Sequence, residues 1–308
     1  MYGTNGQIGT SHLPAQCKHP SFILGRKGAY RGVHYSDCPF SVIDTAFYAE
    51  PLTDRIDLKW AYYKFLTYDI NGMDSGSAIP STDRYQIYSI EVEVPPLEKQ
   101  RKIVAVLDCI DRKININQKV NDNLEQQAVA LFKSWFVDFS LFGGTVPENW
   151  EDTTLENITT LITRGIAPKY SDNSDQTVVN QKCIRNHTID LSLARTHTPK
   201  AINEKWLKFG DLLINSTGDG TLGRVAQVWF APKALTVDSH VTIVRPAREE
   251  LIFYIGLWGI LHEKEIESLH TGSTGQTELP RDRVKMLKLL LPDNISLSRF
   301  NSIITPMA

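Results

Sequence analysis

Arginine, lysine, amide and hydroxyl side chains gather in three segments of the second half of this sequence, residues 163–170, 180–187 and 215–224. Arginine can pair bidentately with guanine, asparagine and glutamine can pair with adenine, and lysine, tyrosine and hydroxyl groups can hold phosphates. The candidate DNA-binding residues in these segments are Arg164, Lys169, Tyr170, Gln181, Lys182, Arg185, Asn186, Ser216, Thr217, Thr221 and Arg224. Ordinary basic surface loops have a similar composition, so the segments alone leave both interpretations open.

The distribution of charge favours an anionic partner more than the net charge does. The formal net charge is only −2. Residues 1–36, however, contain four basic residues and no acidic residue, and residues 163–208 contain eight basic residues against four acidic ones. Such a local excess is expected of a face that contacts phosphates, although clustered lysines also occur without a ligand. The first of these segments adds the candidates Arg26, Lys27 and Arg31.

The sequence lacks the residue spacings of common catalytic and metal sites. It contains no N-P-P-[FY] or D-P-P-Y methyltransferase run, no G-K-[ST] phosphate loop and no H-E-x-x-H pair, and its eight histidines are dispersed. Its four cysteines form no C-x-x-C pair, which argues against a zinc site and against a disulfide scaffold. We therefore expect no catalytic residue and no metal in this chain.

The glycine pattern Gly218-x-Gly220-x-x-Gly223 matches the dinucleotide-binding fingerprint. That site needs a helix after the glycines to hold a pyrophosphate. The residues that follow, RVAQVWF, alternate as a strand does. The pattern therefore predicts a tight hairpin with polar residues at its tip rather than a cofactor site.

Residues 95–143 are predicted to form one long helix that separates the two halves of the chain. Pro95 and Pro96 suit a first helical turn, and Gly143 and Gly144 suit its end. Seam residues recur at alternating spacings of four and three, which is typical of a coiled coil. A helix of about 42 residues at about 1.5 Å each would be about 63 Å long. The seam consists of Ile103, Leu107, Ile110, Ile114, Asn117, Asn121, Leu124, Ala128, Leu131 and Trp135.

Two asparagines, Asn117 and Asn121, occupy seam positions where apolar residues would bind a partner helix more tightly. Buried amides at such positions fix the register of a coiled coil and weaken it. The faces beside the seam are charged, which favours an exposed helix that pairs with another helix over a helix buried in a core.

The run PPLEKQRKI, followed by the pattern LD..D.KI..N...N..LE..A..LFK.WFVDF, resembles the central conserved helix of the specificity subunits of type I restriction-modification systems. The resemblance covers residues 95–139. It implies an α+β fold with two target-recognition domains, each of mixed α/β structure with a β-rich sheet, on either side of the coiled-coil helix. It also implies a non-catalytic subunit that recognises a bipartite DNA sequence.

The resemblance further implies the partners of this chain. They would be double-stranded DNA, modification (methyltransferase) subunits that methylate adenine, and a restriction subunit that combines translocation with endonuclease activity. S-adenosylmethionine and ATP would be cofactors of those partners, and this chain would hold none. Self-association through the central helix is also expected.

A sequence repeat supports the same organisation. The segment FILGRKGAYRG (22–32) parallels LLINSTGDGTLGR (212–224), and a predicted helix with Trp60 parallels one with Trp258. The chain then divides into residues 1–94, the C-terminal part of a first target-recognition domain; 95–143, the spacer helix; 144–292, a second such domain; and 293–308, the start of a distal conserved helix. Relative to the family, we expect the chain to be truncated at both ends.

Composition is consistent with about two globular domains, since 42% of the 308 residues are apolar and 22% are charged. The most apolar run, residues 251–261, falls short of the roughly 20 residues that span a bilayer, and no targeting segment is visible. A cytoplasmic protein is expected. Two alternatives remain: the recognition part of a fused restriction-methylation enzyme, which the missing methyltransferase motif disfavours, and a coiled-coil scaffold without a DNA role.

Overall fold

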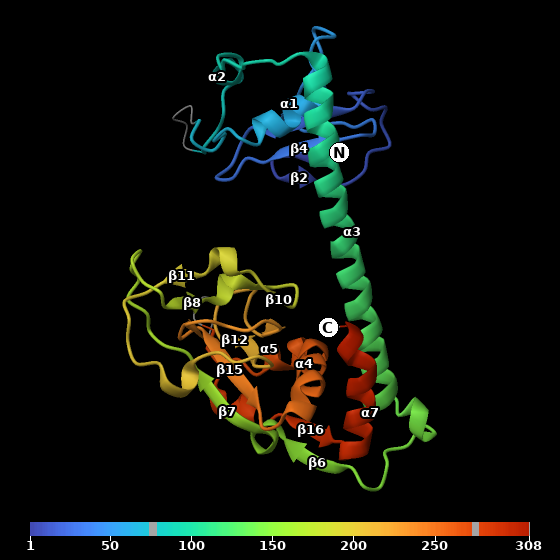
Figure 1. Cartoon of the computed structure of the whole chain (residues 1–308), viewed down its shortest axis with the longest axis vertical. Coiled ribbons are helices and arrows are strands. Elements are labelled where there is room, and N and C mark those ends of the chain that lie inside the picture. Colours follow the sequence, from blue (N-terminus) through green and yellow to red (C-terminus); the bar gives the residue numbers. More distant parts are fainter. Residues whose placement is uncertain (74–78, 273–276, 308) are drawn as a thin grey trace. The chain divides into compact units, whose positions relative to one another are not determined.

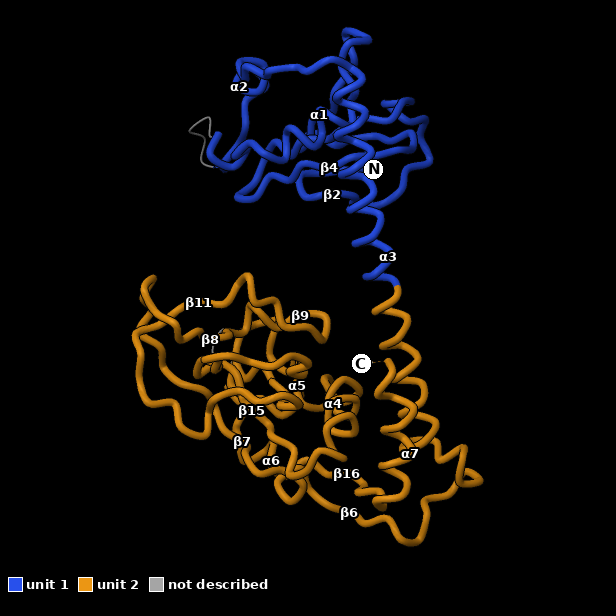
Figure 2. Tube along the Cα trace, in the orientation of Figure 1, with its two compact units in different colours: residues 1–119 blue, residues 120–308 orange. Residues whose placement is uncertain are grey.

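The computed structural model describes residues 1–73, 79–272 and 277–307 of the chain. The chain forms two compact units, Met1–Lys119 and Val120–Ala308 (Figure 2). The long helix α3 (Leu97–Phe136) contributes residues to both, because the division falls inside it.

The first unit is built on an antiparallel sheet with the strand order β4-β3-β5. Its central strand β3 (Ser21–Gly25) is buried along its whole length. Successive side chains point to opposite faces, so Phe22 and Leu24 pack with Trp60 while Ile23 packs with Phe40. The other elements of this unit are β1 (Tyr2–Gly3), β2 (Gly6–Gln7), β4 (Val33–Ser36), β5 (Ala46–Tyr48), α1 (Leu58–Phe65) and α2 (Arg84–Tyr88).

The first turns of α3 belong to the first unit. The buried side chain of Gln100 donates to the carbonyls of Arg55 and Pro95 and accepts from the backbone N–H of Asp57. That N–H lies at the start of α1, where the Asp57 carboxylate also caps the helix. Further along, Lys59 Nζ lies 2.6 Å from the Asp108 carboxylate. Helices α1 and α3 are therefore joined by polar contacts as well as by apolar packing.

The last turns of α3 lie in the core of the second unit, where Phe132 and Phe136 are buried. The helix ends at Phe136, short of residue 143, the predicted end. Phe139 adopts a left-handed conformation with φ of 51°, and the ring of Phe142 packs 5.1 Å from that of Trp150. The chain therefore leaves the helix early because these aromatic side chains turn back onto the core.

The second unit contains a four-stranded antiparallel sheet with the order β13-β12-β15-β7 and a three-stranded mixed sheet with the order β11-β8-β14 (Figure 1). Two further strand pairs, β9-β10 and β6-β16, are antiparallel. The strands are β6 (Glu151–Thr154), β7 (Thr159–Arg164), β8 (Thr177–Val179), β9 (Ile184–Arg185), β10 (Thr188–Ile189), β11 (Arg195–Thr196), β12 (Leu212–Asn215), β13 (Val225–Gln227), β14 (Leu235–Val237), β15 (Val241–Pro246) and β16 (Lys288–Leu291). The helices after β15 are α4 (Ile252–Leu261), α5 (Glu263–Ser268), α6 (Arg281–Lys285) and α7 (Asn294–Ile304).

Helix α7 packs beside the last turns of α3 (Figure 1). The ring centroid of Phe300 lies 4.8 Å from that of Phe136, 5.7 Å from that of Trp135 and 6.1 Å from that of Phe132. The Asp293 carboxylate caps α7 by accepting from two backbone N–H groups. The predicted start of a helix after residue 292 is therefore present.

The sequence repeat corresponds to a repeat of topology. In the first unit β3 pairs with β4 and β5, and α1 follows; in the second unit β12 pairs with β13 and β15, and α4 follows. Both helices bury a tryptophan, Trp60 in α1 and Trp258 in α4. The loop after each central strand is held in the same way, since Arg26 N donates to Thr45 O and Ser216 N donates to His240 O, each at 2.8 Å.

The architecture is a mixed α+β fold with sheet-rich regions before and after one long helix in the sequence, which confirms the predicted fold class. Within residues 1–73, 79–272 and 277–307, none of the helices combines the length and the apolar character needed to cross a membrane.

Candidate nucleic-acid interface

The glycine pattern forms the hairpin loop between β12 and β13, as predicted. Gly218, Gly220 and Gly223 all have positive φ, between 67° and 99°. A Cβ atom on Gly223 would lie 2.8–2.9 Å from atoms of Glu267, so the backbone approaches α5 as closely as only glycine allows. A strand, β13, follows the loop. The helix that a dinucleotide site requires is therefore not at this position.

A polar network brings two of the predicted segments together at this hairpin. The Thr217 hydroxyl lies 3.1 Å from Gln181 Oε1 and 2.7 Å from His240 Nδ1. The Thr221 hydroxyl donates to the carbonyl of Thr217. Gln181 is half-buried, as are Thr217, Thr221 and Arg224. These side chains fix the shape of the loop from inside, and each keeps part of its surface accessible.

Ser216 and Arg31, two of the predicted DNA-binding residues, are buried in the structure and bonded within their own units. Ser216 is fully buried, and its hydroxyl shares a 2.6 Å hydrogen bond with Thr242. Arg31 is 2% exposed, and its guanidinium donates to the carbonyls of Gly28, Ile70 and Asn71, among others. Both side chains form their hydrogen bonds within their own unit, because the loop that carries each one directs it toward the interior. Sequence alone gave no sign of this direction.

Arg164, at the end of β7, is also largely engaged inside the protein. Its guanidinium forms an ion pair with Glu278 and donates to the carbonyl of Leu279 at 2.8 Å. Its side chain is only 22% exposed. Leu279 N in turn donates to Ser216 O at 2.9 Å. Arg164 therefore ties β7 to the segment that supports the hairpin loop.

Lys169 and Tyr170 lie on an exposed stretch after β7. The guanidinium carbon of Arg195 lies 3.6 Å from the centre of the Tyr170 ring, and Tyr170 pairs with His197 in an isolated β-bridge. The flat ring and the exposed guanidinium form a surface that could stack on a base or approach a phosphate. Arg195 was not among the predicted residues, because no regular spacing links positions 170 and 195.

Lys182, Arg185 and Asn186 are exposed around the turn between β9 and β10. Asn186 and His187 form this turn, and both have positive φ, 48° and 58°. This is the geometry of a two-residue hairpin turn of type I′. The turn projects its basic and amide side chains away from the unit, as direct contact with a base would require.

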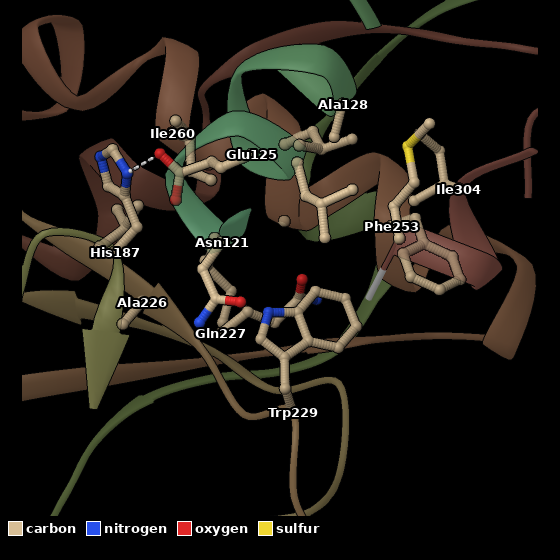
Figure 3. A pocket seen from close by; sticks show the side chains of 16 residues that line it. Asn121, Glu125, Ala128, His187, Ala226, Gln227, Trp229, Phe253, Ile260 and Ile304 are labelled. Atoms are coloured by element: carbon tan, nitrogen blue, oxygen red, sulfur yellow. Dashed lines mark hydrogen bonds and ion pairs between the residues drawn. The ribbon is translucent and has the colours of Figure 1, made fainter. Parts of the chain in front are cut away.

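His187 holds this turn against α3 and α5, and Figure 3 shows its contact with Glu125 of α3. Its Nδ1 lies 2.7 Å from the Glu125 carboxylate of α3, and its Nε2 lies 3.6 Å from the Glu263 carboxylate of α5. The carboxylates of Glu263 and Glu125 raise the pKa of His187 to about 9, against the opposing effect of burial. The histidine, its proton and the two acids therefore form an ionic clamp, which we call the His187 clamp.

The His187 clamp lies at the edge of an apolar pocket of the second unit (Figure 3). Helix α3 contributes Asn121, Leu124 and Ala128 to the pocket, and α4 contributes residues such as Phe253. Trp229 closes one side, and its indole is 41% exposed. No sequence pattern indicated this pocket, because its walls come from segments that are distant in the sequence.

In the first unit, Arg26 and Lys27 are half-buried after β3. Lys27 Nζ forms a 3.0 Å ion pair with the carboxylate of Asp44, and Arg26 donates to the Asp44 carbonyl. The guanidinium of Arg26 also lies 5.4 Å from the centre of the Phe47 ring. Both cations remain partly accessible, unlike Arg31.

The helix seam divides into three parts. Ile103 and Leu107 are half-buried, and Ile103 packs in the first unit. Ala128 and Trp135 are buried in the second unit, with Leu124 and Leu131 half-buried. The middle seam residues are exposed: Ile110, Ile114, Asn117 and Asn121. Neighbouring Val106, Ile116 and Val120 are 62%, 59% and 48% exposed, so an apolar stripe runs along the middle of α3.

Comparison with known proteins connects this fold to one family. Residues 18–126 match the model of the type I restriction modification DNA specificity domain. The type I restriction enzyme MjaIX specificity subunit of Methanocaldococcus jannaschii is 24% identical over 284 residues, which cover 82% of this chain and 63% of the relative. The HindI specificity subunit of Haemophilus influenzae is 37% identical over 78 residues, which cover 25% of this chain and 16% of the relative. The chain thus spans less than two thirds of the length of these relatives.

The crystal structure of a type I restriction-modification S subunit from M. genitalium has the same fold. Its TM-score is 0.55 at 16% identity, and the match covers 99% of this chain and 80% of that one. The matched domain includes β3 to β5, α1 and most of the long helix. This chain is therefore a homologue of the specificity subunits of type I restriction-modification systems, the family that its long helix resembles.

Proposed function

We propose that this chain is a non-catalytic subunit that recognises a bipartite DNA sequence for a type I restriction-modification complex. The match of residues 18–126 to a DNA specificity domain carries this proposal. The surface chemistry of the second unit supports it, because exposed arginine, lysine, tyrosine and amide groups gather between β7 and β12.

The β9-β10 turn is the part of the second unit that best fits direct contact with bases. Arg185 suits guanine and Asn186 suits adenine, and both are exposed on a turn whose backbone is fixed by the His187 clamp. Lys169, Lys182 and the stacked Tyr170–Arg195 pair suit phosphates or an exposed base face. In the first unit, Arg26 and Lys27 are the corresponding candidates.

Helix α3 is proposed to set the distance between the two halves of the recognised site. Its 40 residues correspond to about 60 Å at about 1.5 Å per residue. That length equals between one and two turns of duplex at about 3.4 Å per base pair. A stiff helix of this length suits a spacer better than a flexible linker would.

The partners follow from the same proposal. The exposed apolar stripe in the middle of α3 would pack against helices of modification subunits or of a second copy of this chain. The modification subunits would supply S-adenosylmethionine for adenine methylation, and a restriction subunit would supply ATP-driven translocation and cleavage. The complex would act in the cytoplasm.

Sequencing of methylated adenines tests the proposal directly. The chain and its modification subunits are expressed in a host that lacks adenine methylation, with the modification subunits alone as the control. We expect a bipartite methylated motif only when this chain is present. A purified complex that forms with the modification subunits, binds no DNA and leaves no motif would identify a coiled-coil scaffold instead.

A further inference from the structure

Three side chains of types that can bind a metal, two of them close together in the sequence and one distant, meet at one edge of the first unit. They are Cys17, His19 and Glu50, and one potential ligand atom from each lies within 4.8 Å of the others. We propose that these residues form a binding site for a divalent zinc-type cation. The spacing of the cysteines predicted no zinc site, but that argument covers only ligands that are neighbours in the sequence.

The backbone holds all three residues in place. Cys17 exchanges two backbone hydrogen bonds with Phe40, of 2.9 and 3.0 Å, and its side chain is buried beside Ile23. His19 lies just before β3, and Glu50 lies just after β5. Strands β3 and β5 are paired, and the Ser21 hydroxyl donates to Ala49 O at 2.6 Å. The three ligands are therefore positioned by the sheet.

The distance between the cysteine and histidine ligand atoms is close to the value for tetrahedral coordination. Zinc bonds of about 2.3 Å to sulfur and about 2.0–2.1 Å to nitrogen place the two ligand atoms about 3.6 Å apart at a tetrahedral angle. Cys17 Sγ lies 3.7 Å from His19 Nε2. The Glu50 carboxylate lies 2.8 Å from the same Nε2 and would move outward by about half an ångström to share a metal. Its side chain is 55% exposed and is free to do so.

The second nitrogen of His19 has the partner that a metal-binding histidine usually has. Metal-ligating histidines donate their other N–H to a carbonyl or carboxylate, which fixes the tautomer and the ring orientation. His19 Nδ1 lies 3.1 Å from the carbonyl of Pro20. A proton on Nδ1 leaves the Nε2 lone pair free for a metal on the side of Glu50. Cys17 Sγ lies 3.7 Å from Nε2 and 3.8 Å from Nδ1, so the imidazole ring would turn on binding to let Nε2 and the thiolate share one ion.

The ligand set selects the class of cation. A thiolate, an imidazole and a carboxylate together suit zinc, whereas calcium and magnesium prefer oxygen ligands alone. Three protein ligands leave a fourth position for water or for a group from a partner, and solvent reaches the cluster, since the side chains of His19 and Glu50 are 36% and 55% exposed. Binding would replace the proton of the Cys17 thiol and join the start of β3 to the end of β5.

Cobalt titration of the full-length chain tests the site, with Co²⁺ as a spectroscopic substitute for Zn²⁺. After chelator treatment, we expect one equivalent of Co²⁺ to produce a thiolate-to-cobalt absorption band that one equivalent of Zn²⁺ removes. Cys17→Ser should abolish the band. Cys38→Ser and Cys109→Ser are matched controls at the two exposed cysteines, and both should retain it.

Glu50→Gln tests the site with a variant that should fold normally, because Glu50 is exposed and contributes nothing to the core. This variant should bind Co²⁺ at least tenfold more weakly, and Zn²⁺ should raise its Tm less than that of the wild-type chain. Absence of a thiolate band in the wild-type chain would overturn the proposal. So would a band that survives Cys17→Ser or that depends on Cys38. DNA recognition does not enter these measurements.

Discussion

Replacing His187 by glutamine should destabilise the second unit in a strongly pH-dependent way. Glutamine keeps a polar side chain of moderate size, but it cannot carry the positive charge that the carboxylates of Glu263 and Glu125 stabilise on His187. The carboxylates raise the pKa of His187 to about 9, compared with the ordinary value of 6.5. The shift of about 2.5 pH units corresponds to about 3 kcal/mol of additional stability for the folded state.

The direction of the pH dependence follows from the raised pKa. The folded state binds the proton more tightly than the unfolded state does, so the stabilisation is fully present below about pH 6.5. It decreases as the pH rises toward about 9, where the folded protein also loses the proton. Burial opposes ionisation of Glu263, but the hydrogen bonds from His187 and from the Val225 N–H lower its pKa, with a smaller contribution from Arg224.

Urea unfolding followed by tryptophan fluorescence measures the effect. Five of the six tryptophans lie in the second unit, so the signal reports mainly on that unit. The free energy of unfolding of His187→Gln should be lower than that of the wild-type chain by about 3 kcal/mol at pH 6 and by much less at pH 9.5. His270→Gln, at an exposed histidine of the same unit, is the control and should leave the difference near zero at both values.

An equal loss of stability at pH 6 and pH 9.5 would refute this reasoning, because it would show that packing rather than charge makes His187 important. Glu125→Gln provides an independent check. It removes the acid at 2.7 Å but keeps the shape of the side chain, and it should reproduce part of the pH dependence.

Three further predictions concern the proposed DNA role. Arg185→Ala should weaken binding to the cognate site by about 1–3 kcal/mol and should weaken binding to random DNA much less, which fluorescence anisotropy measures. Arg164→Ala should instead lower the free energy of unfolding, measured in urea, because Glu278 loses its partner. Asn117→Leu with Asn121→Leu should tighten self-association of α3, which sedimentation measures, and an unchanged monomer fraction would contradict the seam. Seven residues inserted between these asparagines should lengthen the spacer of the methylated motif by about 3 base pairs. An unchanged spacer would show that α3 does not set the distance between the two half-sites. A four-residue insertion, which breaks the seam, should lower methylation activity sharply.

Sequence patterns predicted the regular elements well because those elements depend on local rules. The heptad pattern located α3, and the alternation after Gly223 located β13. Contacts between distant residues produced the differences. The helix predicted around Trp258 ends at Leu261, and a separate helix begins at Glu263, whose side chain accepts from Val225 N.

The direction of a side chain was the property that sequence could not supply. Arg31 and Arg185 are both arginines in glycine-rich or polar loops, yet one is buried against backbone carbonyls and the other is exposed. The His187 clamp and the Cys17 cluster were missed for a related reason. Each depends on a residue that only the fold brings close, Glu50 beside Cys17 and His19, and Glu125 beside His187, so the spacing in the sequence did not reveal them.

The repeat between the two units helps to separate scaffold residues from recognition residues. In the repeated loops after the central strands, Arg31 and Ser216 serve the internal structure of their units, whereas Arg26 and Lys27 remain partly accessible. The exposed residues Lys169, Arg185 and Arg195 lie instead in residues 165–205, before β12 and outside the repeated elements. Because the same arrangement of strands and helix occurs in both units, part of each loop after the central strand is occupied by contacts that maintain this arrangement. If the proposed DNA role holds, we therefore expect the base contacts of the second unit to come from the segment that the repeat does not include, which holds the β9-β10 turn and the Tyr170–Arg195 pair.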